Sequence, residues 1–440
     1  MASLLAGCGP RMWRQPRLSQ AGPTNFVPSD ASSVYRAMGL LTDSTRLRFV
    51  GSLRYLAGAT RDSTLAVLSV SLRNSALTFE PQGGDFIASY HVDLTFRSDS
   101  GGGPLALQVP RDETVRVNNI RETQRRDESV VFQEFVAVRP GTYSVSVVVR
   151  DANSPAVASA IIVDTVPSFA GPSLGSPIPV YEGSGRTRLG ATPLLVVNPR
   201  GMLRTGTDSL RCYIEGYHWK AGTRVVARFV APDTAELWRD TLTLTGDTTL
   251  AHAQVLIRPG QLPLGRGELR ITAVGAPAHA EVPLVVGFSD RWAVANIDQL
   301  STLLRYFSAQ DLVDKLHTAP REQRAAAWHE LYHRSDPDST TPQNEALDEY
   351  LRRIETANQR YSEPMMPGWQ TDRGEVLVTL GEPDQTFDMG GVLPGLRWEY
   401  TRPHLSLVFK DVSGGMGVYR LTTDSRIDFE HATEWVRRTK

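Results

Sequence analysis

The sequence predicts a multidomain chain in which two all-β regions precede a C-terminal α+β domain. Three observations lead to this fold class. Apolar and polar residues alternate along many short segments between Arg46 and Val274, as they do in half-buried strands. From about Phe288 onward, apolar residues instead recur at helical spacing. Short alternating segments return after the helices, so a small antiparallel sheet is expected to close the chain.

The composition is that of a chain that buries ordinary protein cores. Its 440 residues are enough for about three domains. Hydrophobic residues make up 41% and charged residues 22%, as is usual in globular proteins. The 47 basic and 48 acidic residues leave a net charge of -1, so the positive surface of a nucleic-acid binder is not expected. No apolar run reaches the roughly 18 residues of a membrane-spanning helix.

The first all-β region is expected over residues 46–165. Near its end, Pro140 and Gly141 predict a turn, and an alternating strand that begins near Tyr143 follows. This pattern resembles the penultimate turn and strand of immunoglobulin-like sandwiches, where the tyrosine closes the end of the barrel. We therefore predict an immunoglobulin-like sandwich. Earlier strands are expected at 65–72, 90–96 and 130–136.

A second sandwich is expected over residues 179–288. The stretch Val166–Gly185 is rich in Pro, Gly and Ser and indicates a linker, which we place at 166–178. Cys212 lies in a strand-like run and is expected to be a small buried thiol. The last strand again follows a Pro/Gly turn, as in the first region. Strands are expected at 194–197, 209–216, 223–230, 242–245 and 269–274.

The N-terminal tetrapeptide Leu5-Ala6-Gly7-Cys8 resembles the lipobox of bacterial lipoproteins, in which the cysteine is lipidated and becomes the new N-terminus. Residues 1–8 would then be a signal remnant, and 9–45 a polar tether with one short helix. The seven residues before Cys8 lack a basic start and a full apolar segment, so we expect the true start further upstream. If the tetrapeptide is a chance match, a cytoplasmic protein is expected.

Residues 289–440 are expected to form helices followed by a sheet. The clearest helix is Asn344–Tyr361, whose apolar residues lie on one side. The most informative stretch of the chain follows it: Gly368-Trp369-Gln370-Thr371-Asp372, then Arg373-Gly374, an apolar run, and Leu380-Gly381-Glu382-Pro383-Asp384. Strands are expected at 375–380, 398–400, 405–411 and 417–421.

This stretch resembles the signature of the bacterial GWxTD-domain family, which is named for the pentapeptide. Asp336-Pro337 and the helix start at Asn344-Glu345 also match that family. The resemblance implies a helix-then-sheet domain and a place in the cell envelope. It implies no reaction, because the role of the family is undefined. The family-motif positions are Gly368, Trp369, Thr371, Asp372, Arg373, Gly374, Gly381, Pro383 and Asp384.

The residue types of the signature suit a structural turn. Gly368 allows a backbone approach that a side chain would hinder. Trp369 is expected to seal the helices against the strands. Thr371 and Asp372 are expected to cap backbone amides. Arg373 is expected to pair with Asp372, Asp384 or Glu399.

The segment from Leu380-Gly381-Glu382-Pro383 through Trp398-Glu399-Tyr400 to the strand ending at Asp411 resembles a second family. It is similar to the small lipoproteins of the outer-membrane barrel-assembly machinery over about 45 residues. This likeness agrees with the lipobox at Cys8, and convergent turn chemistry would also produce it.

Two catalytic alternatives remain open. Four carboxylates lie near an arginine, and a pair of them could act as acid and base on a sugar; they could equally form caps and ion pairs around a turn. His329-Glu330-Leu331-Tyr332-His333 places two imidazoles one helical turn apart with a glutamate between them, which is the zinc-protease pattern. The alternative for this helix is a packed face with solvated histidines. The four carboxylates are Asp372, Glu382, Asp384 and Glu399, and third zinc ligands could come from Glu345, Glu349 or Glu355.

The sequence thus favours a non-enzymatic cell-envelope lipoprotein that acts in protein interaction or envelope organisation. Its expected contacts are other envelope proteins and, through a lipidated Cys8, a membrane, with the outer membrane favoured. No nucleic acid and no cofactor are expected. The first alternative is a zinc hydrolase with Glu330 as the base and His329 and His333 as ligands. The second is a carbohydrate-binding or carbohydrate-cleaving envelope protein, with glycans as ligands.

Overall fold

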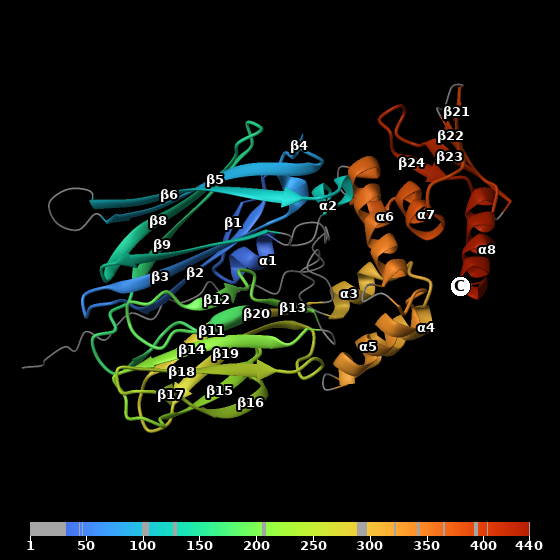
Figure 1. The fold of residues 1–440 in the computed structure, drawn as a ribbon. Helices are drawn as coiled ribbons and strands as arrows, with labels where there is room; N and C mark the ends of the chain where they lie inside the picture. Colours follow the sequence, from blue (N-terminus) through green and yellow to red (C-terminus); the bar gives the residue numbers. More distant parts are fainter. Residues whose placement is uncertain are drawn as a thin grey trace, which may run out of the picture.

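A computed structural model describes residues 32–43, 45, 47–98, 105–125, 130–204, 208–287, 297–320, 323–340, 344–363, 366–390, 395–402 and 404–439. Cys8 and the lipobox lie outside these residues. Two β-sandwiches are followed by a helical region and a small sheet (Figure 1), which confirms the predicted fold class. Among the described residues, no helix is both long and apolar enough to cross a membrane.

The first sandwich packs a four-stranded sheet against a five-stranded sheet. Buried and less buried residues alternate as predicted along two strands of the larger sheet, Asp85–Ser98 and Gly141–Asp151. Sheet I has the order β1-β2-β3-β7, and sheet II has the order β4-β5-β8-β9 with β6 also paired to β5. All pairs are antiparallel. The elements are α1 Ser32–Ala37, β1 Leu41–Asp43, β2 Phe49–Ala57, β3 Thr64–Leu72, η1 Asn74–Ala76, β4 Glu80–Gln82, β5 Asp85–Ser98, β6 Leu105–Val117, α2 Ile120–Thr123, β7 Val130–Val138, β8 Gly141–Asp151 and β9 Val157–Val166.

The second sandwich consists of sheets III and IV. Sheet III has the order β12-β11-β14-β18-β17 with β10 paired to β14, and sheet IV has the order β13-β20-β19-β15-β16. Buried Cys212 belongs to the core between them, and its burial raises the pKa of the thiol. The strands are β10 Ser173–Leu174, β11 Ile178–Gly185, β12 Leu194–Val197, β13 Met202–Arg204, β14 Leu210–Tyr217, β15 Arg224–Val230, β16 Glu236–Thr243, β17 Thr245–Gly246, β18 Leu250–Ile257, β19 Gly265–Ala273 and β20 His279–Gly287.

The two sandwiches lie face to face, so the four sheets form one stack in the order II, I, III, IV (Figure 1). Leu56 and Val67 of sheet I pack against Ile178, Val180 and Tyr213 of sheet III. The central strands of these two sheets, such as β2 and β3 of sheet I and β14 of sheet III, are consequently buried on both faces. In β2 and β3 almost every residue is buried, which removes the alternation expected of a sheet with one wet face.

Polar contacts also join the two sandwiches. The Gln133 amide of β7 donates to the Leu195 carbonyl (2.7 Å) and accepts from the Val197 amide (3.2 Å), so one side chain covers the edge of β12. The Ser176 amide donates to the Tyr55 carbonyl at 2.8 Å. The composition of Val166–Gly185 indicates a linker, which we place at residues 166–178. The short strand β10 lies inside this linker, and the rest of the stretch is strand β11, which pairs with β14 and β12.

A buried ion pair lies at this junction. The Arg186 guanidinium binds both oxygens of Glu215 (2.9 and 2.8 Å), and the two side chains are 1% and 0% exposed. Tyr213 and Tyr217 donate their hydroxyls to the same carboxylate. The guanidinium also donates to the Ala191 carbonyl (3.3 Å) and, across the junction, to the Ala57 carbonyl of sheet I (2.7 Å). Every polar atom of the pair thus has a partner, as a buried charge requires.

The C-terminal region consists of helices, a four-stranded antiparallel sheet of order β21-β22-β23-β24, and a final helix. Its helical core surrounds Trp328 and Trp369, and a second core lies between the sheet, α7 and α8. The elements are α3 Ile297–Leu303, α4 Gln310–Thr318, α5 Arg324–Arg334, α6 Glu345–Tyr361, η3 Gly368–Gln370, α7 Asp372–Leu380, β21 Gln385–Met389, β22 Gly395–Tyr400, β23 Leu405–Asp411, β24 Tyr419–Leu421 and α8 Thr423–Thr439.

The strand predicted at Glu375–Leu380 is wrong, because these residues form helix α7. Val376 packs on the sheet, whereas Leu377 and Val378 pack on the helices. A short helix buried on opposite sides shows a continuous apolar run, which periodicity alone does not separate from a buried strand. Helix α8 was not predicted at all, and neither was the edge strand β21.

We predict that Arg186→Met lowers the free energy of unfolding by about 3–5 kcal/mol, since it leaves the Glu215 carboxylate buried without its cation. Guanidinium titration of the full chain measures this. Arg204→Met is the control, because Arg204 and Asp208 form an exposed pair whose loss should cost about 0–1 kcal/mol. Equal effects of the two substitutions would contradict a supporting role for the buried pair.

Candidate functional site

The first residue of the signature, Gly368, lies where the backbone of η3 contacts the backbone of helix α6. Gly368 opens η3 directly against helix α6, and a Cβ at this position would lie 1.9 Å from the Ala357 carbonyl oxygen. Its amide donates to the Ser362 hydroxyl at 3.1 Å, and the Trp369 amide donates to the Asn358 side chain at 3.2 Å. The glycine is therefore required for close approach.

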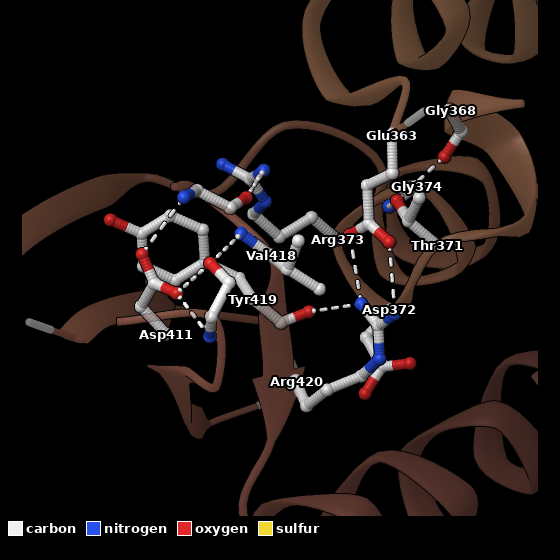
Figure 2. Close-up of polar contacts among 12 residues, drawn as sticks. Glu363, Gly368, Thr371, Asp372, Arg373, Gly374, Asp411, Val418, Tyr419 and Arg420 are labelled. Carbon is white, nitrogen blue, oxygen red and sulfur yellow. Dashed lines mark hydrogen bonds and ion pairs between the residues drawn. The ribbon is translucent and has the colours of Figure 1, made fainter. Parts of the chain in front are cut away.

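Thr371 and Gly374 start helix α7. The Thr371 hydroxyl accepts from the Gly374 amide (3.1 Å) and donates to the Gly368 carbonyl (2.7 Å), so one hydroxyl caps the helix and closes the preceding turn (Figure 2). A Cβ on Gly374 would lie 1.8 Å from the same carbonyl oxygen. The capping role predicted for Thr371 is confirmed.

Trp369 is fully buried within the helical core. Its ring meets Tyr306 edge-on, with centroids 6.0 Å apart, and the Arg305 guanidinium lies 4.8 Å from the ring centre. The tryptophan thus packs among helices, rather than sealing helices against strands as predicted. Helix α7 instead joins the helices to the strands, because it contributes residues to both cores.

Asp372 ties the start of α7 to the end of the chain. Its carboxylate accepts from the Leu421 amide of β24 (2.7 Å) and pairs with Arg426 of α8 (3.1 Å). Arg426 also binds Glu375 at 2.8 Å. A carboxylate in the first helical turn is further favoured by the helix dipole.

Arg373 does not pair with Asp372, Asp384 or Glu399, contrary to the prediction. Its guanidinium lies between the rings of Tyr361 and Tyr419, 4.9 and 4.3 Å from their centres. Figure 2 shows Arg373 next to Tyr419. Arg373 also donates to the Gly417 carbonyl at 3.1 Å, and burial lowers the pKa of its guanidinium. Stacking on aromatic faces is a preferred arrangement for arginine, and composition alone did not reveal it.

Arg373 thereby supports the loop between β23 and β24. Asp411 at the end of β23 accepts from the amides of Ser413 (2.8 Å) and Gly417 (2.9 Å) and from the Ser413 hydroxyl. These hydrogen bonds lower the pKa of its carboxyl, with the Ser413 hydroxyl as the largest cause. Asp411 belongs to the same structural unit as the signature, although it lies about 40 residues downstream of it.

The second half of the signature ends α7. Gly381 has a φ of 93°, a backbone conformation that favours glycine, and its amide donates to the Leu377 carbonyl. The Tyr400 hydroxyl donates to the Gly381 carbonyl at 3.0 Å. Pro383 follows, and the Asp384 carboxylate accepts from the Thr401 amide at 2.6 Å, which holds the turn against β22.

The four candidate carboxylates have separate partners. Asp372 binds Arg426 and Asp384 caps a turn, as described above. Glu382 pairs with Arg360 at 2.8 Å, and Glu399 pairs with Arg397 at 2.9 Å. Each is engaged in its own cap or ion pair, so among the described residues these four carboxylates form no free acid–base pair.

The His-Glu-x-x-His segment lies on helix α5, as predicted. His329 and His333 are exposed, with ring centroids 4.2 Å apart, whereas Trp328 and Leu331 are buried on the other side. Glu330 between them binds Lys315 (2.5 Å) and Arg334 (3.2 Å), which lower its pKa. Among the described residues, no group of three His, Cys, Asp or Glu could hold a metal ion.

The third zinc ligands that the sequence offered are engaged elsewhere. Glu349 on α6 binds Arg352 and Arg353, and the Arg352 hydrogen bond is the largest cause that lowers its pKa to about 2. Glu345 and Glu355 also have interaction partners. A small pocket of about 60 Å³ lies near Glu349, between Tyr306, Tyr350, Thr379 and Arg437, away from the two histidines.

The sequence profile of the GWxTD domain family matches residues 278–426, which include the signature, the preceding helices and the following sheet. The chain contains a GWxTD domain. The signature of this domain is a joint: it fastens α6, α7, β24 and α8 to one another. A search of curated protein sequences finds no match to the chain.

Solved structures offer weak similarities, which lie at low sequence identity. Trypsin-activated alpha-2-macroglobulin from Escherichia coli is 12% identical, with 56% of this chain and 17% of that chain covered and a TM-score of 0.20. A structure of the native conformation of the E. coli macroglobulin is 10% identical, with 54% of this chain and 16% of that chain covered and a TM-score of 0.17. The FN1–FN3 domains of chicken CNTN1 are 8% identical (57% and 97% covered, TM-score 0.14). The matched region thus spans about a sixth of the macroglobulin, and TM-scores this low do not indicate a shared function.

We predict that Gly374→Ala prevents correct folding of the GWxTD domain or destabilises it by several kcal/mol, because the added methyl would overlap the Gly368 carbonyl. Thermal unfolding of the full chain measures the effect. Gly390→Ala is the control, since a Cβ there meets nothing within 4 Å. A Gly374→Ala protein as stable as this control would contradict the close approach.

Proposed function

We propose that the protein is a non-enzymatic cell-envelope lipoprotein that acts in protein interaction or envelope organisation. One observation carries the non-enzymatic part: the polar signature residues are committed to contacts inside the GWxTD domain. Thr371 caps a helix, Asp372 joins β24 and α8, Arg373 stacks between two tyrosines, and Asp384 holds a turn. A catalytic group needs a proton-transfer partner within reach of substrate, and these groups already have internal partners.

The architecture supports a role in spacing and interaction. A stack of four sheets, joined by the Arg186–Glu215 pair and the Gln133 contacts, resists bending between the sandwiches. Sandwich modules are commonly spacers or binding surfaces, and function lies in sites on them rather than in the fold. The GWxTD domain lies at one end of this stack (Figure 1), where Leu264 of the second sandwich packs on its helical core.

The envelope location rests on Leu5-Ala6-Gly7-Cys8 and on the family resemblance. A lipidated Cys8 would anchor the chain, and a multiply acylated cysteine would do so stably. The polar stretch that follows would act as a tether between the membrane and the sandwiches.

We expect Cys8→Ser to move the protein from the membrane fraction to the soluble fraction when it is produced from its own locus with its upstream DNA. Metabolic labelling with a fatty acid should mark the original chain and not the variant. Cys212→Ser is the control, because the buried Cys212 thiol should not be acylated. Membrane association and labelling that survive Cys8→Ser would overturn the anchor.

We expect the purified chain to contain no stoichiometric zinc, because Glu330 is held by Lys315 and Arg334 and both histidines face solvent. Elemental analysis after purification without chelators measures the zinc content of the original chain and of the His333→Ala and His317→Ala variants. About one zinc per chain that is lost on His333→Ala and kept on His317→Ala would overturn the non-enzymatic assignment in favour of a zinc hydrolase.

A further inference from the structure

Strand β9 has an unusual outward face. Its alternate residues Ala158, Ile162 and Val166 point into the first sandwich, and the others point outward. An outward face in contact with water is normally polar. On β9 it carries Val157, Ile161 and Val163, which are 46%, 69% and 65% exposed. The other two outward residues are Ser159 and Thr165, so this face of β9 has no charged side chain.

The same strand also has an edge with which no other strand pairs in the described part of the chain. It is the terminal strand of sheet II, next to β8. At one end the edge is covered, because the Ser159 amide donates to Asp43 (2.6 Å) and Thr45 donates to the Val157 carbonyl (3.3 Å). At the other end Pro167 has no amide hydrogen. The backbone groups of Ile161 and Val163 point the same way as those of Ser159, so the open window is Ile161–Thr165.

Another edge strand of the stack is protected where β9 is not. The edge of β12 is filled by the Gln133 amide, which bonds both Leu195 and Val197. Natural proteins usually block an exposed strand edge with a charge, a proline or a covering segment, because such an edge pairs readily with another strand. Within Ile161–Thr165 the one charged residue, Asp164, accepts from the Tyr55 hydroxyl at 2.8 Å and so does not project from the outward face.

We propose that β9 is a self-association surface, in which Ile161–Thr165 pairs antiparallel with the same residues of a second copy about a twofold axis at Val163. The window is centred on Val163, so two antiparallel copies match from end to end. Val163 would face Val163 of the second copy, and Ile161 would face its Thr165. Sheet II would then continue across the dimer.

A second copy suits this surface better than a charged partner. The outward residues beside the window on β8 are Thr142, Ser144 and Ser146, which lie opposite Thr165, Val163 and Ile161. Two such edges can pair without like-charge repulsion between their side chains, and the net charge of -1 adds little repulsion between the copies. The local bond from the Thr165 amide to Asp164 (2.8 Å) would give way to the pairing bond.

Sedimentation velocity of the full chain over a range of concentrations tests the proposal. We expect a monomer–dimer equilibrium that Val163→Lys and Ile161→Lys weaken by roughly tenfold or more, since a lysine charge would enter the paired surface. Val157→Lys is the matched control: it adds the same charge to the same face where β1 already covers the edge. Because all three side chains are exposed, thermal midpoints should remain unchanged at concentrations at which the original chain is monomeric.

Disulfide trapping tests the register. In a Cys8→Ser background, Val163→Cys should form a covalent dimer under mild oxidation, because directly paired residues lie about 5.5 Å apart between Cα atoms, within disulfide reach. Ile161→Cys should not, since in this register it lies too far from its own copy. A monomer at all concentrations would overturn the proposal and leave an extended strand of another protein as the occupant of β9. Dimerisation reduced equally by Val157→Lys, or trapping by Ile161→Cys alone, would also overturn it.

Discussion

The structure depends on burying both faces of two sheets at once. Sheets I and III lie in the middle of the stack, and a sheet with two buried faces leaves no solvent for its polar groups. The Arg186–Glu215 pair sits at that junction with essentially no exposure. Removing two charges from water is costly, and the pair is tolerated because two tyrosines and the Ala57 and Ala191 carbonyls satisfy the remaining polar atoms. The relative placement of the sandwiches follows from that network.

The GWxTD signature solves a similar problem on a smaller scale. Three backbones meet at Gly368 and Gly374, too closely for any side chain. The hydroxyl of Thr371 satisfies the Gly374 amide, which has no intrahelical partner at the start of α7, and the carboxylate of Asp372 satisfies the Leu421 amide of β24. Arg373 extends the unit to the β23–β24 loop through two aromatic rings. The motif is therefore understood as a set of packing and hydrogen-bonding constraints, and its residue types need no catalytic explanation.

The candidate site shows which features a sequence pattern predicts and which it does not. The spacing of His329, Glu330 and His333 correctly places both imidazoles on one helix face, but it does not say what surrounds that face. Lys315 on the neighbouring helix α4 takes the glutamate, and the packing face formed by Trp328 and Leu331 turns the histidines to solvent. Arg420 and Arg426 also belong to the signature unit in space, because Arg420 binds Glu363 and Arg426 binds Glu375. No local motif marked these two arginines, since their partners lie more than 50 residues away in sequence.

The sequence by itself determined the order of all-β regions, helices and small sheet, because periods of two and 3.6 are local properties of a strand and a helix. It also determined the position of the signature turn and the cap at Thr371. Only the tertiary structure decided that Val376–Leu380 is helical, that the sandwiches stack face to face, and that Arg373 meets rings rather than carboxylates. Those outcomes depend on which distant surfaces bury one another. Burial against distant segments produces no regular spacing of apolar residues in the sequence. An apolar run that is buried on two sides has the same pattern in a helix and in a strand.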